Sequence, residues 1–252
     1  MSQGKIKLAL VGYGKMGREI EKLVHTDYRE SFDVVSRIDP EARDSDYNEI
    51  NAESVGEADI CIDFTRSDSV VDNIKRLVDL EKRIVVGTTG WDDRIPEVRG
   101  YVGEVNGGLI YAPNFSFGVN AYLFGIRKAA KILALSDKFR YELIETHHAE
   151  KKDAPSGTAK KMAQALREAE IPFSDEEIKS ERFGNVVGRH ILRIGSPYEK
   201  IEFYHDAQNR RGFADGALAA ARWIQDKSGF FTIDDMFDDI MDGSKQDTVG
   251  CM

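Results

Sequence analysis

The densest group of residues able to do chemistry lies between positions 145 and 158, where the chain reads ETHHAEKKDAPSGT. The adjacent histidines His147 and His148 can gain or lose a proton near neutral pH, and Lys151 brings positive charge beside them. Ser156 is a favourable N-cap residue, so the helix that it opens directs its first free N–H groups back toward this cluster. Cations beside a helix N-terminus bind carboxylate or phosphate groups, and we therefore expect a small anionic substrate here.

Two other interpretations of the same run stay open from the residues alone. In one, the histidines end a strand and the lysines are solvated surface charges. In the other, His147, His148 and Glu150 bind a metal ion, although neighbouring histidines on a strand point to opposite faces. We expect no metal.

A second group, GYGKMG, follows an apolar strand and precedes a helix. Glycines there allow a tight turn, the approach of a pyrophosphate to the backbone, and close packing of helix against strand. Asp39 ends the next strand about 20 residues later, where a carboxylate can bind the ribose hydroxyls of a dinucleotide. The group predicts dinucleotide binding by Gly12, Tyr13, Gly14, Lys15, Met16, Gly17 and Asp39.

The choice between NADH and NADPH is open at this point. Asp39 favours NADH, because a carboxylate repels the 2′-phosphate of NADPH. Lys15, Arg37 and Arg43 lie nearby in the sequence and could offset that repulsion, or could be ordinary surface charges.

Two further loops follow apolar strands, and we expect them at the same edge of a parallel sheet, where ligands bind. They are Gly87-Thr88-Thr89-Gly90 and Ala112-Pro113-Asn114-Phe115. Each alone could be an ordinary turn.

The elements that must position these residues follow from hydrophobic periodicity. Apolar strands are predicted over 5–11, 32–38, 58–64, 84–86 and 109–112, with helices after the first and third. This alternation predicts an α/β fold with a Rossmann-type, doubly wound parallel sheet. The pattern then changes and predicts an open α+β layer. Its expected elements are a helix over about 119–133, an alternating strand over 139–143, a helix over 156–169, and strands over 186–194 and 200–205. A last helix is predicted over 214–224.

The composition excludes several classes of protein. A formal net charge of −9 argues against general binding to nucleic acid or to anionic membranes. The apolar run Ile6–Val11 is too short for a signal sequence or a membrane span. Cys61 and Cys251 fit no disulfide framework, so we expect a cytoplasmic protein.

These motifs resemble the dihydrodipicolinate reductase family, now called 4-hydroxy-tetrahydrodipicolinate reductases, of lysine and diaminopimelate biosynthesis. The resemblance rests on VGYGKMGRE, CIDFT, VVGTTGWDD, APNFSFGVN, ETHHAEKKDAPSGTA and FADGALAAARW, and spans about residues 5–237. It implies that a reduced nicotinamide, NADH or NADPH, delivers hydride to C4 of an unsaturated cyclic imine and that the resulting enamine is protonated at C3. It leaves open whether His147 or Lys151 is the immediate proton donor.

The resemblance also implies site residues and an organisation. Proton transfer is assigned to His147 and Lys151, and binding of the dicarboxylate substrate to His148, Gly157, Thr158 and Arg210. Cofactor binding is assigned to Gly12–Gly17, Asp39, Gly87–Thr89 and Ala112–Phe115. A dinucleotide-binding domain, 1–117 with 211–252, is interrupted by a substrate-binding and tetramerisation domain, 118–210, and the enzyme is expected to be a homotetramer.

The chain departs from the family pattern at three places. Pro40 stands where many members carry a basic residue, Arg189 replaces a common acid, and the stretch between Ala169 and Arg182 is short. A catalytically inactive dinucleotide-sensing protein of the same fold is the alternative function.

Overall fold

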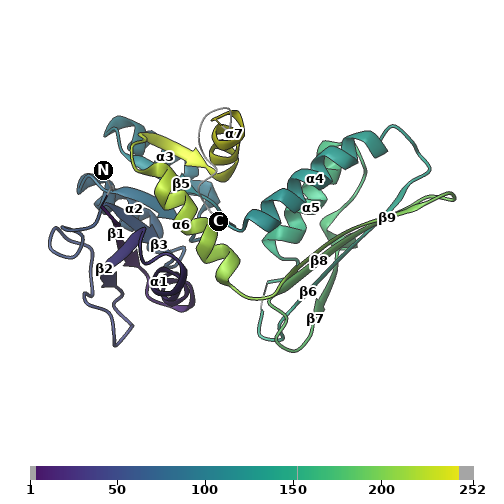
Figure 1. Ribbon diagram of the computed structural model, residues 1–252. Helices are drawn as coiled ribbons and strands as arrows, with labels where there is room; N and C mark the ends of the chain where they lie inside the picture. The colour runs from purple at the N-terminus through teal and green to yellow at the C-terminus, as the bar shows by residue number, and fades with distance from the viewer. Residues whose placement is uncertain (1–3, 152, 244–252) are drawn as a thin grey trace. The chain divides into compact units, whose positions relative to one another are not determined.

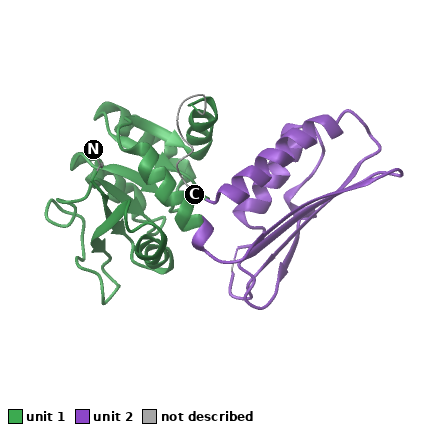
Figure 2. Ribbon diagram, viewed as in Figure 1, with its two compact units in different colours: residues 1–115, 213–252 green, residues 116–212 purple. Residues whose placement is uncertain are grey.

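The computed structural model describes residues 4–151 and 153–243, which fold into two compact units (Figure 2). Unit 1 comprises the described residues of 1–115 and 213–252, and unit 2 comprises those of 116–212. Unit 2 is therefore inserted between two segments of unit 1.

Unit 1 is built on a six-stranded sheet in the order β10-β5-β4-β3-β1-β2, with every neighbouring pair parallel. The strands are β1 (Ile6–Val11), β2 (Phe32–Ile38), β3 (Ile60–Asp63), β4 (Arg83–Val86), β5 (Gly108–Tyr111) and β10 (Gly229–Thr232). The strand order reverses between β1 and β3, and ligands of open α/β sheets bind at such a switch point, beyond the carboxyl ends of the strands.

Helices cover both faces of this sheet (Figure 1). They are α1 (Lys15–Asp27), α2 (Val70–Asp79), α3 (Ile95–Glu104), α6 (Arg211–Ile224) and α7 (Ile233–Gly243), with a 3-10 turn at Asp92–Arg94. Leu8 and Leu10 of β1 pack into one core with α1, α6 and α7, whereas Ala9 and Val11 pack into a second core with α2 and α3. The predicted doubly wound parallel sheet is thereby confirmed.

Unit 2 is a four-stranded mixed sheet in the order β7-β6-β8-β9. Its elements are α4 (Phe117–Leu133), β6 (Arg140–His147), α5 (Gly157–Glu168), a 3-10 turn (Asp175–Glu177), β7 (Lys179–Arg182), β8 (Gly188–Gly195) and β9 (Lys200–Ala207). β6 and β7 are parallel and the other pairs are antiparallel. Both helices lie on the same face of the sheet, and Leu143, Leu192 and Ile194 are buried in this unit, which confirms the open α+β layer (Figure 1).

Four elements were not predicted from the sequence, and each carries a weak signal. The sequence of β7 is Lys-Ser-Glu-Arg, which has no apolar residue, and β10 is four residues long. Helix α3 contains two glycines, Gly100 and Gly103, and α7 carries five aspartates. Strand β6 also runs past Leu143, where the sequence predicted its end, and stops at His147. The prediction was too short because the later buried positions hold Glu145 and His147 in place of apolar residues.

Two smaller findings bear on the expectations above. Among residues 4–151 and 153–243, no helix combines the length and apolar character needed to cross a bilayer. Cys61 is buried with a free thiol, and Cys251 lies outside the described residues.

Candidate functional site

The carboxyl ends of four neighbouring strands in unit 1 lie at one edge of the sheet. In the parallel registers, Val11 pairs with Asp63, Asp63 with Val86, and Val86 with Tyr111. The three segments predicted to bind the cofactor begin directly after these strands, at Gly12, Gly87 and Ala112. The fold therefore brings them to the same edge.

The first of these segments has the backbone that a dinucleotide requires. Gly12 has φ 86°, and a Cβ atom there would lie 2.4 Å from the Phe64 carbonyl oxygen, so only glycine fits. A Cβ atom at Gly17 would lie 2.5 Å from the Gly12 oxygen, which shows how closely α1 approaches β1. At Gly14 no heavy atom lies within 4 Å of a Cβ position, so the backbone before α1 is open to a pyrophosphate.

Asp39 is held in place by backbone donors at the rim of a pocket. Its Oδ2 accepts a hydrogen bond from Tyr13 N at 2.8 Å, and its Oδ1 accepts from Glu41 N at 2.8 Å and Ala42 N at 3.1 Å. The pocket has a volume of about 390 Å³, and its lining includes Gly12, Gly14, Asp39, Phe64, Thr65 and Asn73. The residues present therefore fit the ribose and pyrophosphate of a bound dinucleotide.

The charge of Arg37 is already neutralised within unit 1. Its guanidinium donates to Glu21 and, at 3.0 Å, to Asp46, and the hydrogen bond to Glu21 raises the pKa of Arg37. Tyr13 is buried and donates its hydroxyl proton to the same Glu21 carboxylate. Lys15 and Arg43 are exposed. Tyr13 and Arg37 thus stabilise the loop, and Arg37 is not free to meet a 2′-phosphate.

The second and third cofactor segments contain both buried and accessible residues. The Thr88 hydroxyl donates to the buried Asp63 at 2.7 Å and accepts a hydrogen bond from Thr65 N at 2.7 Å, while Thr89 is exposed. The sequence did not point to Asp63, which ties these loops together and whose pKa is raised by burial.

Within the third segment, Ala112 and Phe115 are buried, Pro113 is exposed and Asn114 is half-buried. The ring of Phe115 packs edge-on against Phe64, with ring centroids 6.3 Å apart.

In unit 2, three polar side chains that β6 and β8 carry are buried together. Glu145, His147 and His190 are 0%, 7% and 4% exposed. The Glu145 Oε2 atom lies 3.4 Å from His147 Nδ1 and 3.9 Å from His190 Nε2, and the two imidazole centroids are 5.1 Å apart. The sequence predicted a role for His147 but none for Glu145 or His190. The signal that was missed is the polar alternation of Glu145 and His147 on a strand.

Several donors surround the Glu145 carboxylate. Ser156 N lies 3.1 Å from both carboxylate oxygens, the Ser180 hydroxyl donates at 2.8 Å, and the Arg182 guanidinium lies at 3.4 Å. Burial alone would raise the pKa of Glu145, but the hydrogen bonds from Ser156 and Ser180 hold it below its usual value. Glu145 is therefore a buried anion.

Both histidines beside this anion are held in the neutral form. Burial lowers the pKa of His147, and the nearby charges of Lys151 and Arg182 lower it further. Burial also lowers the pKa of His190, to about 3. A Cβ atom at Gly188 would lie 3.2 Å from His147 Nε2, so the imidazole packs directly over this glycine. His147 can accept a proton and return it without leaving its position.

The remaining predicted residues lie at three places in unit 2: Gly157 and Thr158 open α5, Lys151 and His148 lie in the loop after β6, and Arg210 directly precedes α6. Lys151 Nζ lies 2.7 Å from Asp153 Oδ1, and Ser156 Oγ accepts a hydrogen bond from Ala159 N at 3.2 Å as the N-cap. Gly157 is exposed at the first position of α5, and Thr158, His148 and Arg210 are half-buried. The first-turn N–H groups of a helix have no intrahelical partner and can receive an anion.

The group with metal-ligand geometry differs from the one suggested by the sequence. Ligand atoms of Glu145, His147 and His190 lie within 4.8 Å of one another, without His148 or Glu150. The Glu145 carboxylate already receives donors from three residues, one of them the cationic Arg182, which opposes a second cation there. A hydrogen-bonded acid–base cluster explains these residues better than a metal centre.

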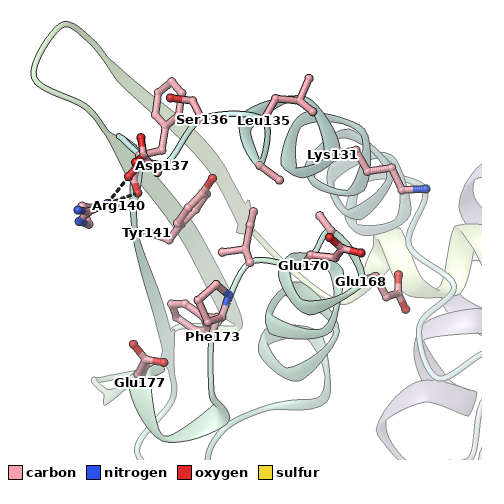
Figure 3. A pocket seen from close by; sticks show the side chains of 15 residues that line it. Lys131, Leu135, Ser136, Asp137, Arg140, Tyr141, Glu168, Glu170, Phe173 and Glu177 are labelled. Carbon is pink, nitrogen blue, oxygen red and sulfur yellow. Dashed lines mark hydrogen bonds between the residues drawn. The ribbon is translucent and has the colours of Figure 1, made fainter.

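A separate hollow of about 820 Å³ lies elsewhere in unit 2, between the C-terminal ends of α4 and α5 and the start of β6 (Figure 3). Its lining includes Lys131, Tyr141, Glu168 and Phe173, and none of the predicted site residues. We assign it no part in the chemistry.

A doubly wound parallel sheet with a glycine-rich loop and an acidic residue after the second strand is typical of the dinucleotide-binding domain of oxidoreductases. The model of the N-terminal part of dihydrodipicolinate reductase matches residues 6–115, and that of the C-terminal part matches residues 118–237. The chain belongs to the dihydrodipicolinate reductase family, and it is an enzyme that reduces 4-hydroxy-tetrahydrodipicolinate with a nicotinamide dinucleotide in the diaminopimelate and lysine pathway.

Individual relatives agree with this assignment. The chain is 33% identical to the 4-hydroxy-tetrahydrodipicolinate reductase of Christiangramia forsetii, over 93% of this chain and 99% of the relative. It is 34% identical to that of Archaeoglobus fulgidus, over 93% and 86% of the two chains. These relatives favour the reductase over the catalytically inactive sensor.

Solved structures agree at the level of the fold. A dipicolinate-bound dihydrodipicolinate reductase from Paenisporosarcina has a TM-score of 0.73 and 24% identity, over 90% of this chain and 97% of the other. A myo-inositol dehydrogenase from Corynebacterium glutamicum has a TM-score of 0.54 and 14% identity, over 90% of both chains.

Proposed function

We propose that unit 2 binds the dicarboxylate substrate and supplies the proton of the reduction, while unit 1 binds the cofactor. The observation that carries this proposal is the cluster of the neutral, buried His147, the Lys151 loop and the open first turn of α5. The substrate carboxylates bind the N–H groups of Gly157 and Thr158 together with His148 and Arg210, because a helix N-terminus and cations stabilise anions. This orients the ring of the substrate.

The proton reaches C3 of the substrate from Lys151 or His147. The bound nicotinamide supplies the hydride at C4, and reduction is complete once the enamine gains one proton at C3. Lys151 lies beside Asp153 at the surface of the cluster, whereas His147 is buried behind it. Lys151 can supply its own proton, whereas His147, which is neutral in the resting protein, can donate only after it has taken up a proton from a neighbouring group or the solvent.

We further propose that NADH is the preferred cofactor. The pocket beside Gly12 is lined by three carboxylates, those of Asp39, Glu41 and Glu49, and by two arginines, Arg66 and Arg76. Arg66 is already ion-paired with Glu41 and Asp68, and the nearby Arg37 is occupied by Glu21 and Asp46. A 2′-phosphate would meet these carboxylates, whereas a ribose hydroxyl can donate to Asp39. The ratio of kcat/KM for NADH and NADPH tests this, and a higher value for NADPH would refute it.

The homotetramer is part of the same proposal. On the sheet of unit 2, Ile144, Ile191 and Tyr204 form one cross-strand row. Their sequence neighbours Leu143 and Leu192 are buried, so by strand alternation the row lies on the opposite face of the sheet. Arg189 is ion-paired with Asp206 at 2.9 Å beside that row. A second copy can cover this face, and light scattering during size-exclusion chromatography should give the mass of four chains. A monomer at micromolar concentration would contradict this arrangement.

We also assign the enzyme to the cytoplasm, where reduced nicotinamide cofactors are available. Detection of the protein in the soluble fraction of lysed cells, after separation from membranes and secreted proteins, tests this assignment.

Oxidation of NADH by purified protein, supplied with the product of the preceding synthase, tests the activity. The substitution Lys151→Ala should lower kcat by about 100-fold, the usual contribution of a positioned proton donor, and leave NADH affinity unchanged. An equal loss of both would assign Lys151 a purely structural role.

A further inference from the structure

One buried carboxylate contacts three separate parts of the candidate active site in unit 2. Glu145 faces the His147 imidazole at 3.4 Å, accepts the N–H of Ser156 before α5, and lies 3.4 Å from the Arg182 guanidinium. We propose that Glu145 and Arg182 form a positioning pair for the reduction, an inference that rests on the active site proposed above. Glu145 orients His147 and the start of α5, and Arg182 holds the loop that carries Lys151 and Asp153.

The geometry around His147 defines what Glu145 does to the ring. A carboxylate beside Nδ1 favours a proton on that nitrogen and leaves Nε2, which lies over Gly188, to exchange protons. In serine proteases a carboxylate hydrogen-bonded to Nδ1 orients the catalytic imidazole, keeps its charge and stabilises the cationic ring. Glu145 and His147 make a 3.4 Å contact without a hydrogen bond, so Glu145 acts on the ring through its charge. Without Glu145, neither nitrogen of His147 has an anionic neighbour on the strand.

Arg182 extends this control to the loop that follows β6. It lies on β7, where it pairs in register with His147, and its Nε donates to the Lys151 carbonyl at 3.3 Å. Its Nη2 donates to the Asp153 carbonyl at 2.5 Å. A planar guanidinium can bind two carbonyls and a carboxylate at once, whereas a lysine ammonium lacks that geometry. Arg182 therefore fixes the backbone on both sides of the Lys151–Asp153 ion pair.

The surrounding charges predict how His147 responds to a change at Glu145. The charged and titratable groups facing it are Glu145 on its own strand, Arg182 on β7, His190 on β8, and Lys151 and Asp153 in the loop. Glu145 raises the pKa of His147, whereas Lys151 and Arg182 lower it. Removing the charge of Glu145 therefore lowers the pKa of His147 further, whichever protonation state is active.

The test compares Glu145→Gln with Glu142→Gln on the same strand. Glu142 also pairs with a basic residue of β7, Lys179, but is half-buried where Glu145 is fully buried, so it controls for the loss of an ion pair. Glu145→Gln should lower kcat by about 100-fold with unchanged NADH affinity, while Glu142→Gln stays near wild type.

A direct readout is the NMR titration of the His147 ring, assigned with His147→Asn. In Glu145→Gln this titration should move to lower pH, and Glu145→Asp, which keeps the charge, should return it toward wild type. An unchanged titration, or a kcat within about 3-fold of wild type, would overturn the proposal. A different outcome separates the two proposals. If the His147 titration shifts in Glu145→Gln but the wild-type protein shows no turnover, the proposed function is refuted and the positioning pair stands.

Arg182→Lys tests the second half of the pair, and it serves alone if Glu145→Gln fails to fold. It keeps the charge beside Glu145 but loses the fork, so kcat should fall by about 10- to 100-fold and the substrate KM should rise. The His147 titration should stay near that of wild type. Kinetics equal to wild type would show that Arg182 does not position the loop.

Discussion

The neutral, buried His190 predicts a specific dependence of stability on pH. Burial lowers its pKa from 6.5 to about 3 in the folded protein, whereas the unfolded chain keeps the ordinary value. Below pH 6.5 the unfolded state therefore binds more protons than the folded state, so the free energy of unfolding falls as the pH falls. The stabilising contribution is complete at neutral pH and decreases on acidification toward the folded pKa.

The size of the effect follows from linkage for a single proton. Each pH unit well below 6.5 costs about 1.4 kcal/mol, the value for one proton bound by the unfolded chain only. Integration from pH 7 to pH 5 gives about 2 kcal/mol for His190 alone. His147 and His205, whose pKa values burial also lowers, add slope of the same sign.

The substitution His190→Gln isolates this contribution, because glutamine does not titrate. Urea unfolding of both proteins at pH 7 and pH 5 gives two differences in unfolding free energy, and the wild-type difference should exceed that of the variant by about 2 kcal/mol. The comparison uses slopes, so a general loss of packing in the variant does not affect it. Equal slopes would show that His190 binds protons equally in the folded and the unfolded protein and would refute the neutral cluster.

Three further predictions address the two units separately. Gly188→Ala places a methyl group 3.2 Å from His147 Nε2 and should lower kcat by about 10-fold or more. Gly195→Ala, on the same strand but with open space around it, should leave kcat unchanged. Equal kinetics for both variants would contradict the packing of the His147 ring. Asp39→Asn removes the charge and keeps one oxygen to accept from Glu41 N and Ala42 N, although its NH2 group cannot accept from Tyr13 N. It should raise the NADPH-to-NADH ratio of kcat/KM by about 5-fold, since ~1 kcal/mol of repulsion is lost; an unchanged ratio would show that Asp39 does not face the 2′ position. Ser156→Ala should lower the unfolding free energy by about 1 kcal/mol through loss of the N-cap, measured by urea unfolding; no loss would mean that the cap is dispensable.

The parallel sheet of unit 1 could be predicted because its strands are buried on both faces and read as continuous apolar runs. The glycine-rich loop was equally visible, since Gly12 and Gly17 are required by contacts of 2.4 and 2.5 Å that no side chain tolerates. The edge strand β7 escaped prediction because an edge strand needs no apolar face, and Lys-Ser-Glu-Arg has none.

The candidate site was only partly predictable for a related reason. His147 and Lys151 lie in one short motif, but Glu145, Arg182 and His190 come together through the registers of β6 with β7 and β8. A single sequence contains no signal for those pairings, so a buried glutamate in a strand resembles a surface residue. The occupation of Arg37 by Glu21 and Asp46 depends likewise on contacts between α1, β2 and the following loop.

The central claim is that the cluster in unit 2 is the active site of a dihydrodipicolinate reductase. The most direct measurement is the rate of substrate-dependent NADH oxidation by wild type and by Lys151→Ala, with NADH affinity determined on the same samples. We expect turnover by wild type, a kcat at least about 100-fold lower in the variant, and equal affinities for NADH. A variant that turns over as fast as wild type, or a wild-type protein that oxidises neither NADH nor NADPH with this substrate, would contradict it.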